Sequence, residues 1–216
     1  MTTLERKLNK DKTRKDYKRV AWFYNLWSRL TENKAARTVV DLAEIGDRKK
    51  ILEVACGTGI VFERIVNQNP NGENTGIDLS PVMLSKARKR LKAGKGNFEL
   101  KEGDALNLDF SDNTFDIVIN NFMVDLMPQV YFDKIAREFK RVLKPQGTLV
   151  VATFSFGKKK INLIWLWIAK HFPSLLTGCR PVSFKGNLLQ AGFTIEMDLE
   201  ISQNTFPSEI IKARKT

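Results

Sequence analysis

The sequence is poor in the side chains that most often carry metal or nucleophilic chemistry: its 216 residues include two cysteines and one histidine. Cys56 and Cys179 show no spacing typical of a metal site or of a disulfide framework. We therefore expect free thiols in a reducing compartment and no bound metal. His171, the single histidine, is expected at a surface or interface and not in catalysis.

The chain also lacks a long hydrophobic run. Its most apolar stretch, residues 161–169, is about half the length that a membrane span requires. Residues 1–20 are mostly charged, so we expect no secretory signal. No internal repeat or low-complexity segment is present, and the hydrophobic fraction of 43% indicates a globular chain. We expect a cytoplasmic protein, soluble or peripheral on the inner face of the membrane.

Acidic residues are outnumbered by basic ones: 36 Lys and Arg stand against 24 Asp and Glu, which gives a net charge of +12. A field of this sign favours anionic partners, either nucleic acid or an anionic membrane surface.

Strand and helix patterns alternate along the middle of the chain. We expect strands at 51–56, 75–79, 98–102, 115–120 and 148–154, and helices between them at 59–67, 81–92 and 130–143. Such alternation predicts a parallel sheet with helices on both faces. Outside this region we expect helices at 35–45 and 183–191, and an antiparallel pair of strands at 193–200 and 205–213.

The stretch ILEVACGTGIVFERI, residues 51–65, passes from a buried strand through Gly57 and Gly59 into a helix. Two glycines in three residues indicate that the backbone comes close to another group. The dinucleotide fingerprint needs a third glycine where Phe62 stands, and no Gly-Lys-Ser/Thr follows for a Walker loop. Two interpretations of this turn remain. It is either a tight turn that binds no ligand, or the binding site of a ligand that has no pyrophosphate.

Three acids are associated with successive strands: Glu53 lies inside the first, Asp78 lies at the end of the second and Asp104 follows the third. Glu53, Asp78 and Asp104 are spaced by 25 and 26 residues, one strand–helix repeat each. They should therefore emerge at the same carboxyl edge of the sheet, where open α/β sheets bind ligands. Asp78 also follows the glycines by about 20 residues, the spacing of a ribose-binding acid.

Five motifs in this order resemble those of the class I S-adenosylmethionine-dependent methyltransferases, over roughly residues 22–214. They are EVACGTG at 53–59, GIDLSPVM at 76–83, GDA at 103–105, FDIVI at 115–119 and RVLKPQG at 141–147. The resemblance implies a Rossmann-like, doubly wound α/β fold. Its mostly parallel seven-stranded sheet would have an antiparallel last strand and an N-terminal helical extension. We divide the chain into a basic, aromatic extension or lid, 1–48, and a cofactor-binding domain, 49–216, with an insertion at 157–178.

The resemblance implies an enzyme that binds S-adenosyl-L-methionine and releases S-adenosyl-L-homocysteine. It places the cofactor's amino-acid end near the glycine turn, its ribose on Asp78, and its adenine near Met83 and the turn at 103–105. The cofactor-binding residues so implied are Tyr24, Glu53, Ala55, Gly57, Gly59, Asp78, Leu79, Met83, Gly103, Asp104, Ala105 and Asn120. Ala55 stands where the family usually has glycine.

The segment NNFMVDLMP, residues 120–128, is expected to frame the acceptor. Nucleic-acid amino-methylating enzymes of this class carry Asn/Asp-Pro-Pro-aromatic here, so its absence argues against modification of bases. Neither cysteine fits C5 methylation. Asp125 is the candidate general base, or an orienting group for an amine; a capping or solvated acid is the alternative.

The stretch YNLW at 24–27 resembles the start of the ubiquinone/menaquinone C-methyltransferases and of the bacterial phospholipid N-methyltransferases. The quinone enzymes usually have Asp where Asn25 stands. We expect a hydrophobic or membrane-associated acceptor, first a phospholipid amine headgroup. A quinone precursor, or a soluble metabolite or thiol, is the alternative, and RNA is the least favoured. Residues 1–30 and 158–168, basic and aromatic, are expected to contact an anionic membrane surface. The second could instead be a lid over the acceptor.

Overall fold

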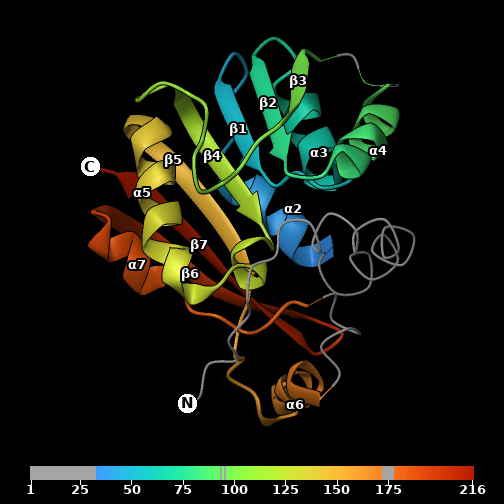
Figure 1. Cartoon of the computed structure of the whole chain (residues 1–216), viewed down its shortest axis with the longest axis vertical. Helices are drawn as coiled ribbons and strands as arrows, with labels where there is room; N and C mark the ends of the chain where they lie inside the picture. The colour runs from blue at the N-terminus through green and yellow to red at the C-terminus, as the bar shows by residue number, and fades with distance from the viewer. Residues whose placement is uncertain (1–32, 93, 95, 172–177) are drawn as a thin grey trace.

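A computed structural model describes residues 33–92, 94, 96–171 and 178–216. Its centre is a seven-stranded sheet with the strand order β3-β2-β1-β4-β5-β7-β6 (Figure 1). The strands β1 to β5 run parallel, and β7 pairs antiparallel with both β5 and β6. The predicted doubly wound, mostly parallel seven-stranded sheet is confirmed.

The elements follow the expected alternation. The strands are β1 (Lys50–Val54), β2 (Glu73–Asp78), β3 (Phe98–Glu102), β4 (Phe115–Asn121), β5 (Leu143–Phe154), β6 (Phe193–Gln203) and β7 (Phe206–Lys215). The helices are α2 (Asn33–Leu42), α3 (Ile60–Gln68), α4 (Pro81–Leu91), α5 (Phe132–Val142), α6 (Leu163–His171) and α7 (Lys185–Gln190). Short 3-10 turns, Val124–Leu126 and Gln129–Tyr131, link β4 to α5.

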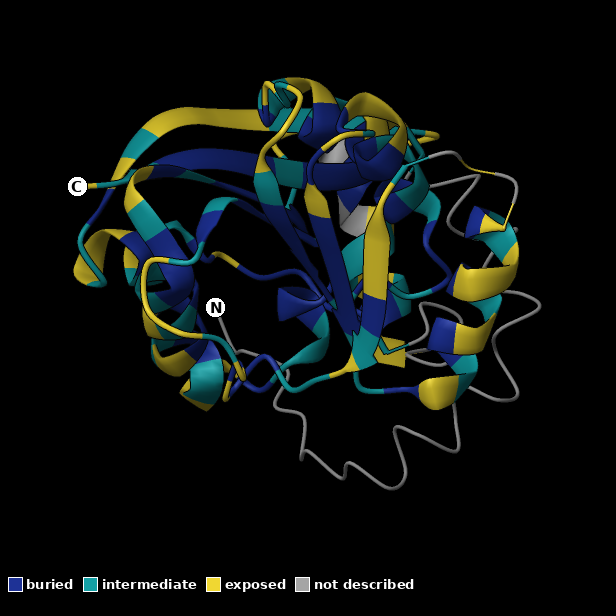
Figure 2. Ribbon diagram, turned by 90° about the horizontal axis from the view of Figure 1, so that it is seen from above, coloured by how far each residue is buried: buried dark blue, intermediate teal, exposed yellow. Residues whose placement is uncertain are grey.

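Helices cover both faces of the sheet because each strand carries apolar side chains on both sides. On one face, α2, α3 and α4 pack over residues such as Ile51, Ile119 and Val150. On the other, α5 and α7 pack over Leu52 and Val118. Figure 2 shows the sheet strands as largely buried, between helices whose outer sides are exposed. The described part of the N-terminal extension, α2, belongs to the first core through Ala35, Ala36, Val39 and Val40.

Three segments differ from the sequence expectation. Strand β5 begins at Leu143 because the Pro145–Gly147 corner is held within it as an irregularity, where Gln146 takes a positive φ of 61°. The strands β6 and β7 extend further than expected and are joined at Asn204 and Thr205, both left-handed, as a tight hairpin requires. The insertion at 157–178 contains a helix, α6. The predicted domain boundary at residue 48 stays a prediction.

Candidate active site

The site is set by the point where the strand order reverses. β1 lies between β2 and β4, so chain connections leave β1 and β4 in opposite directions and open a crevice beyond their carboxyl ends. Val54 and Asn120 are register partners there, and the Asn120 side-chain amide donates to the Val54 carbonyl at 2.9 Å. This bond joins the carboxyl ends of β1 and β4 at the bottom of the crevice, between the glycine turn and the segment after β4.

The glycine turn follows β1 and uses left-handed backbone three times. Ala55, Gly57 and Gly59 have φ values of 60°, 55° and 81°. A Cβ added at Gly57 would meet nothing within 4 Å, whereas one added at Gly59 would lie 3.1 Å from the Cβ of Ala87 in α4. Gly57 therefore faces open space that a ligand can occupy, and Gly59 is required for packing of α4.

Asp78 ties the glycine turn to the end of β2. Its two carboxylate oxygens accept from the backbone N–H groups of Gly57 at 2.8 Å and Ser80 at 2.9 Å. Arg90 supports the turn from the side by donating to the Thr58 carbonyl at 2.9 Å. The backbone that a cofactor would contact is thus held from two neighbouring elements, as pre-organised binding requires.

Two acids lie close together beneath this turn. Burial raises the pKa of Glu53 well above its ordinary range, and the nearby Asp78 charge raises it further. Burial also raises the pKa of Asp78, while its two backbone N–H donors partly oppose the rise. A positively charged ligand would relieve this repulsion, and S-adenosylmethionine carries a sulfonium and an ammonium group.

The other predicted cofactor residues lie at the same edge. Asp78 pairs in register with Glu102, which leads into the turn of Gly103, Asp104 and Ala105. The Asp104 side chain accepts from the Leu106 N–H at 3.0 Å and so shapes this turn. Met83 is 2% exposed in the first turn of α4, and Leu79 is half-buried before it. Tyr24 lies outside the described residues.

Buried polar atoms without a hydrogen-bond partner gather at this edge of the sheet. Among the described residues, such atoms belong to Glu53, Asn120, Asn121, Asp125 and Thr153, and also to Glu209 on β7, which lies two strands from β4 and away from the crevice. Each unpaired buried polar atom costs about 1–3 kcal/mol, so their concentration beside one crevice indicates a place for a polar ligand or water. The sequence places Asn121 only within the acceptor segment 120–128 and does not single out Thr153 or Glu209. The one available signal was the polar Thr153 inside an apolar strand.

Asp125 is fully buried in the turn after β4. The segment after α6 covers it: the Arg180 N–H donates to the Asp125 carbonyl, and the Arg180 guanidinium donates to the Met127 carbonyl at 2.5 Å. Burial raises the pKa of Asp125 to about 7, and the Cys179 thiol and the Arg180 charge only partly offset this. The solvated-acid alternative for Asp125 is excluded by its burial.

The structure also places the cysteines and the histidine. Both cysteines are free and buried. His171 is exposed at the end of α6, where its Nδ1 lies 2.9 Å from the Trp167 carbonyl oxygen. No cluster of His, Cys, Asp and Glu able to hold a metal ion occurs among the residues that the structure describes.

Comparisons with known proteins agree with this geometry. Residues 51–147 match the methyltransferase domain family. Demethylmenaquinone methyltransferase of Thermus thermophilus is 32% identical over 202 residues, 91% of this chain and 87% of that protein. The enzyme of the same name from Thermotoga maritima is 36% identical over 141 residues, 58% of its length. Magnesium protoporphyrin IX methyltransferase of Synechocystis PCC 6803, solved with bound S-adenosylhomocysteine, superposes with a TM-score of 0.73 over 96% of this chain and all of that one, at 15% identity.

The sheet order, the glycine turn and these matches together define an S-adenosylmethionine-dependent methyltransferase fold with its cofactor edge preserved. The chain belongs to the class I S-adenosylmethionine-dependent methyltransferase family, and within it resembles the menaquinone group. It is an enzyme whose cofactor is S-adenosylmethionine, and the residues at the edge fit that cofactor: Gly57 offers open backbone, and Glu53 offers an unpaired carboxylate oxygen.

Proposed function

We propose that this enzyme methylates a ring carbon of a reduced quinone precursor that carries an apolar tail. The observation that carries the proposal is the match to the Thermus demethylmenaquinone methyltransferase over 91% of the chain. That alignment extends well beyond the cofactor-binding motifs, which span residues 51–147 of the family match. It therefore includes segments that frame the acceptor, and these set the choice of substrate.

Of the acceptors expected from the sequence, the quinone precursor is favoured over the phospholipid amine. The named relatives act on demethylmenaquinone. The preference for a phospholipid amine rested on Asn25, where the quinone enzymes usually have Asp, and on the basic N-terminal residues; residues 1–32 lie outside the described part of the chain. The comparisons support the quinone alternative better. A soluble metabolite or thiol has no observation in its favour beyond the general fold.

We propose that the cofactor lies along the glycine turn, with its amino-acid end toward Glu53, Ala55 and Gly59. Gly57 would present its open backbone to the ligand. Asp78, with Leu79 beside it, would face the ribose, because the carboxylate oxygens keep lone pairs beyond the two that accept from backbone N–H groups.

Met83 and the turn at 103–105 would enclose the adenine. Asn120 would set the depth of the pocket through its bond to the Val54 carbonyl. The bound cofactor supplies an electrophilic methyl group on a sulfonium.

We propose Asp125 as the general base. A ring carbon becomes nucleophilic when a ring hydroxyl is deprotonated, so a base with a pKa near neutral is matched to the task. The Asp125 carboxylate would take the hydroxyl proton; the carbon–methyl bond forms as the sulfur–methyl bond breaks. Loss of the ring proton from the same carbon to solvent restores the aromatic ring. Alignment of carbon, methyl and sulfur supplies much of the rate.

The test is a panel of acceptors with methyl-labelled S-adenosylmethionine. Reduced demethylated naphthoquinone with an isoprenoid tail, phosphatidylethanolamine vesicles, and lipid-free fractions of small molecules and of RNA are incubated in parallel. We expect label in the quinone alone. Label in phosphatidylethanolamine would return the acceptor to the phospholipid amine, and label in a lipid-free fraction would remove the lipid-like acceptor altogether.

A further inference from the structure

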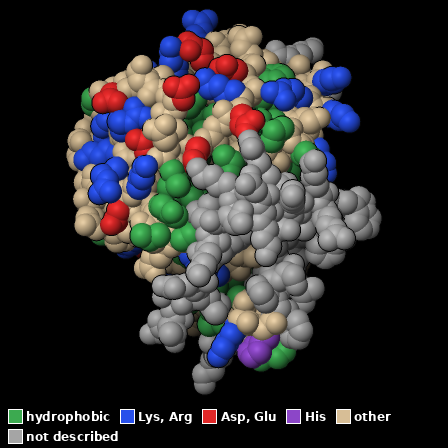
Figure 3. Space-filling view, viewed as in Figure 1, with side chains coloured by type: hydrophobic (Ala, Val, Ile, Leu, Met, Phe, Trp, Pro, Cys, Tyr) green, Lys and Arg blue, Asp and Glu red, His purple; other side chains and the backbone are tan. Residues whose placement is uncertain are grey.

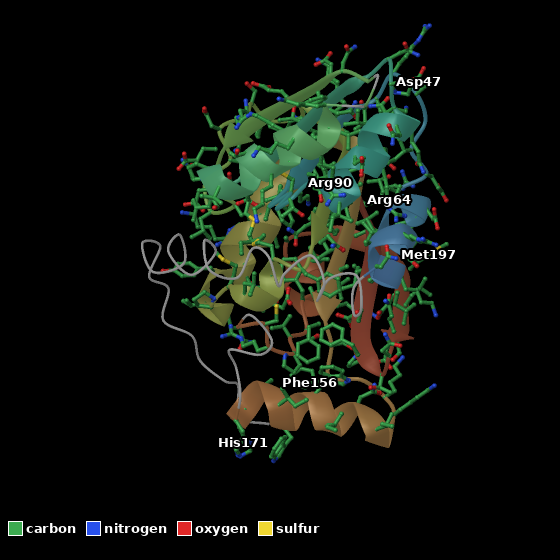
Figure 4. All side chains as sticks on the ribbon, turned by 90° about the vertical axis from the view of Figure 1, so that its right-hand side faces the viewer. Asp47, Arg64, Arg90, Phe156, His171 and Met197 are labelled. Atoms are coloured by element: carbon green, nitrogen blue, oxygen red, sulfur yellow. The ribbon has the colours of Figure 1, made fainter. Side chains whose placement is uncertain are left out.

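Among the described residues, helix α6 contacts the body of the protein along one side. The Trp165 indole N–H donates to the Thr205 hydroxyl at 3.0 Å, and its ring packs edge-on against Phe206 with 5.3 Å between ring centroids. Ala169, one turn along, is buried at 4% exposure. In Figure 4, α6 lies beyond the end of the sheet, with Phe156 between helix and sheet and His171 pointing away from the body.

The opposite side of this helix presents apolar side chains to solvent. Ile161, Ile164 and Trp167 are 59%, 53% and 54% exposed. They are spaced by three residues and so form one stripe along the helix and the turn before it. Single exposed apolar residues are ordinary, but a continuous stripe marks an interaction surface. We call these three residues the outer stripe.

Positive charge surrounds the outer stripe. Residues 157–171 contain four lysines and no acidic residue. Of these, Lys158, Lys159 and Lys170 are exposed. Figure 3 shows a Lys or Arg side chain beside hydrophobic ones and the histidine at this end of the molecule. A second copy of the chain docked through the same stripe would bring these like charges together, whereas an anionic surface would neutralise them.

The segment is also connected to the candidate active site. After α6 the chain returns as Cys179–Val182 and covers Asp125, with the Arg180 N–H donating to the Asp125 carbonyl and the Val182 N–H to the Phe154 carbonyl. Helix α6 therefore lies at the same edge of the sheet as the acceptor side of the crevice. No helix among the described residues is long and apolar enough to cross a bilayer, so α6 would lie in the interface.

We propose that the outer stripe docks on an anionic lipid bilayer, with Ile161, Ile164 and Trp167 at the level of the headgroups and Lys158, Lys159 and Lys170 facing the phosphates. Tryptophan beside cationic side chains is the composition of such an interface. This deepens the proposed function by naming the surface that presents an acceptor with an apolar tail. It does not depend on which acceptor is methylated.

Co-sedimentation of the full chain with vesicles tests the proposal. The vesicles are phosphatidylcholine alone, or phosphatidylcholine with phosphatidylglycerol. We expect the double variant Ile164→Ser/Trp167→Ser to partition into the anionic vesicles at least about tenfold more weakly than the unmodified chain. The control Val130→Ser/Leu189→Ser removes side chains that are 80% and 52% exposed elsewhere, and should stay within about twofold. Calorimetric affinity for S-adenosylmethionine verifies that each variant is folded.

Two further measurements separate the contribution of charge from that of tryptophan insertion. Lys158→Glu/Lys159→Glu/Lys170→Glu should reduce the preference for anionic over neutral vesicles. In a Trp22→Phe/Trp27→Phe background, Trp167→Phe should remove most of the fluorescence quenching by brominated lipid, because the remaining Trp165 is packed against Phe206. Equal partition of the Ile164→Ser/Trp167→Ser variant would overturn the proposal. So would sedimentation velocity showing a dimer that this variant dissociates, with no vesicle binding by the unmodified chain.

Because these readouts follow the protein and not the methyl group, they distinguish failure of membrane docking from failure of the quinone assignment.

Discussion

Among single residues, Asp125 combines full burial with a place on the acceptor side of the crevice. Since burial raises its pKa to about 7, its ionised fraction rises through neutral pH. If it is the base, kcat/KM for the reduced quinone should rise about tenfold per pH unit below pH 7 and level off above. Asp125→Asn should remove this dependence and lower the plateau by about 10²–10⁴-fold, measured by initial rates of methyl transfer.

Glu209 provides the matched control. Burial also raises its pKa to about 7, and Asp198 adds to the rise, but it lies on β7 and carries no role in the proposed chemistry. Glu209→Gln should leave the acidic limb of the rate profile in place. Loss of that limb in Glu209→Gln, or its survival in Asp125→Asn, would remove Asp125 from the role of base.

At the scale of elements, the two glycines of the turn have different roles: Gly57 is assigned to ligand binding and Gly59 to packing against α4. A methyl group at Gly57 meets no protein atom, so Gly57→Ala should cost about 1 kcal/mol of folding free energy from the left-handed backbone alone. It should, however, weaken S-adenosylmethionine binding by about tenfold or more, because the methyl group fills the space proposed for the ligand.

Gly59→Ala should behave in the opposite way. Its new methyl group meets the Cβ and the backbone of Ala87 at 3.1 and 3.2 Å, and α4 must shift to admit it. We expect about 2–4 kcal/mol of destabilisation in urea unfolding, which combines backbone strain with overpacking. Equal stability losses in the two variants, with equal cofactor affinities, would refute the assignment of Gly57 to the ligand.

The elements also show what local sequence can and cannot predict. Strands β1 to β4, helices α3 and α4 and the shared edge of Glu53, Asp78 and Asp104 follow from periodicity and spacing, because each is decided by neighbours in the chain. The depth of Asp125 depends on residues 179–182, more than 50 positions later, which cover it. Because α6 carries apolar side chains on two sides, the sequence shows no helical period there; it predicts an insertion and a membrane contact or lid at 158–168, but not the helix itself.

The sequence also does not show which non-glycine residues adopt left-handed backbone. Ala55, which stands where the family usually has glycine, and Gln146 take positive φ values of 60° and 61°. Hydrogen bonds lie beside both: the backbone N–H of Cys56 donates to the Ile77 carbonyl at 2.9 Å, and the Arg214 guanidinium donates to the Gln146 carbonyl at 2.9 Å. The residue type at these two positions therefore does not predict the backbone φ angle, which the surrounding sheet determines.

For the whole molecule, the buried acids fix how stability depends on pH. Asp125 and Glu209 have folded-state pKa values of about 7, above those of an unfolded chain. Between about pH 4 and pH 7 the folded chain therefore holds protons that the unfolded chain has lost, so the free energy of unfolding falls as pH rises. Acids with lowered pKa values, such as Asp116 and Glu138, change the free energy of unfolding only at lower pH. They therefore do not offset the fall between about pH 4 and pH 7.

Each of the two carboxyl groups should contribute about 2 kcal/mol, less for the partly exposed Glu209, so urea unfolding without cofactor should give a free energy about 3–4 kcal/mol lower at pH 8 than at pH 5.5. The double variant Asp125→Asn/Glu209→Gln should reduce this difference, and the part that remains comes from Glu53, whose pKa burial also raises. A free energy of unfolding that instead rises between these pH values would mean that the two carboxyl groups are solvated or paired in solution.

The central claim, that the chain uses S-adenosylmethionine to methylate a quinone ring carbon, is tested most directly by the position of the transferred methyl group. The chain is incubated with S-adenosylmethionine carrying a deuterated methyl group and with the reduced demethylated quinone, and the product is examined by mass spectrometry and NMR. We predict one deuterated methyl group on a ring carbon for each S-adenosylhomocysteine released. A methyl group on oxygen or on an added phospholipid amine, or S-adenosylhomocysteine formed without methylated quinone, would contradict the account.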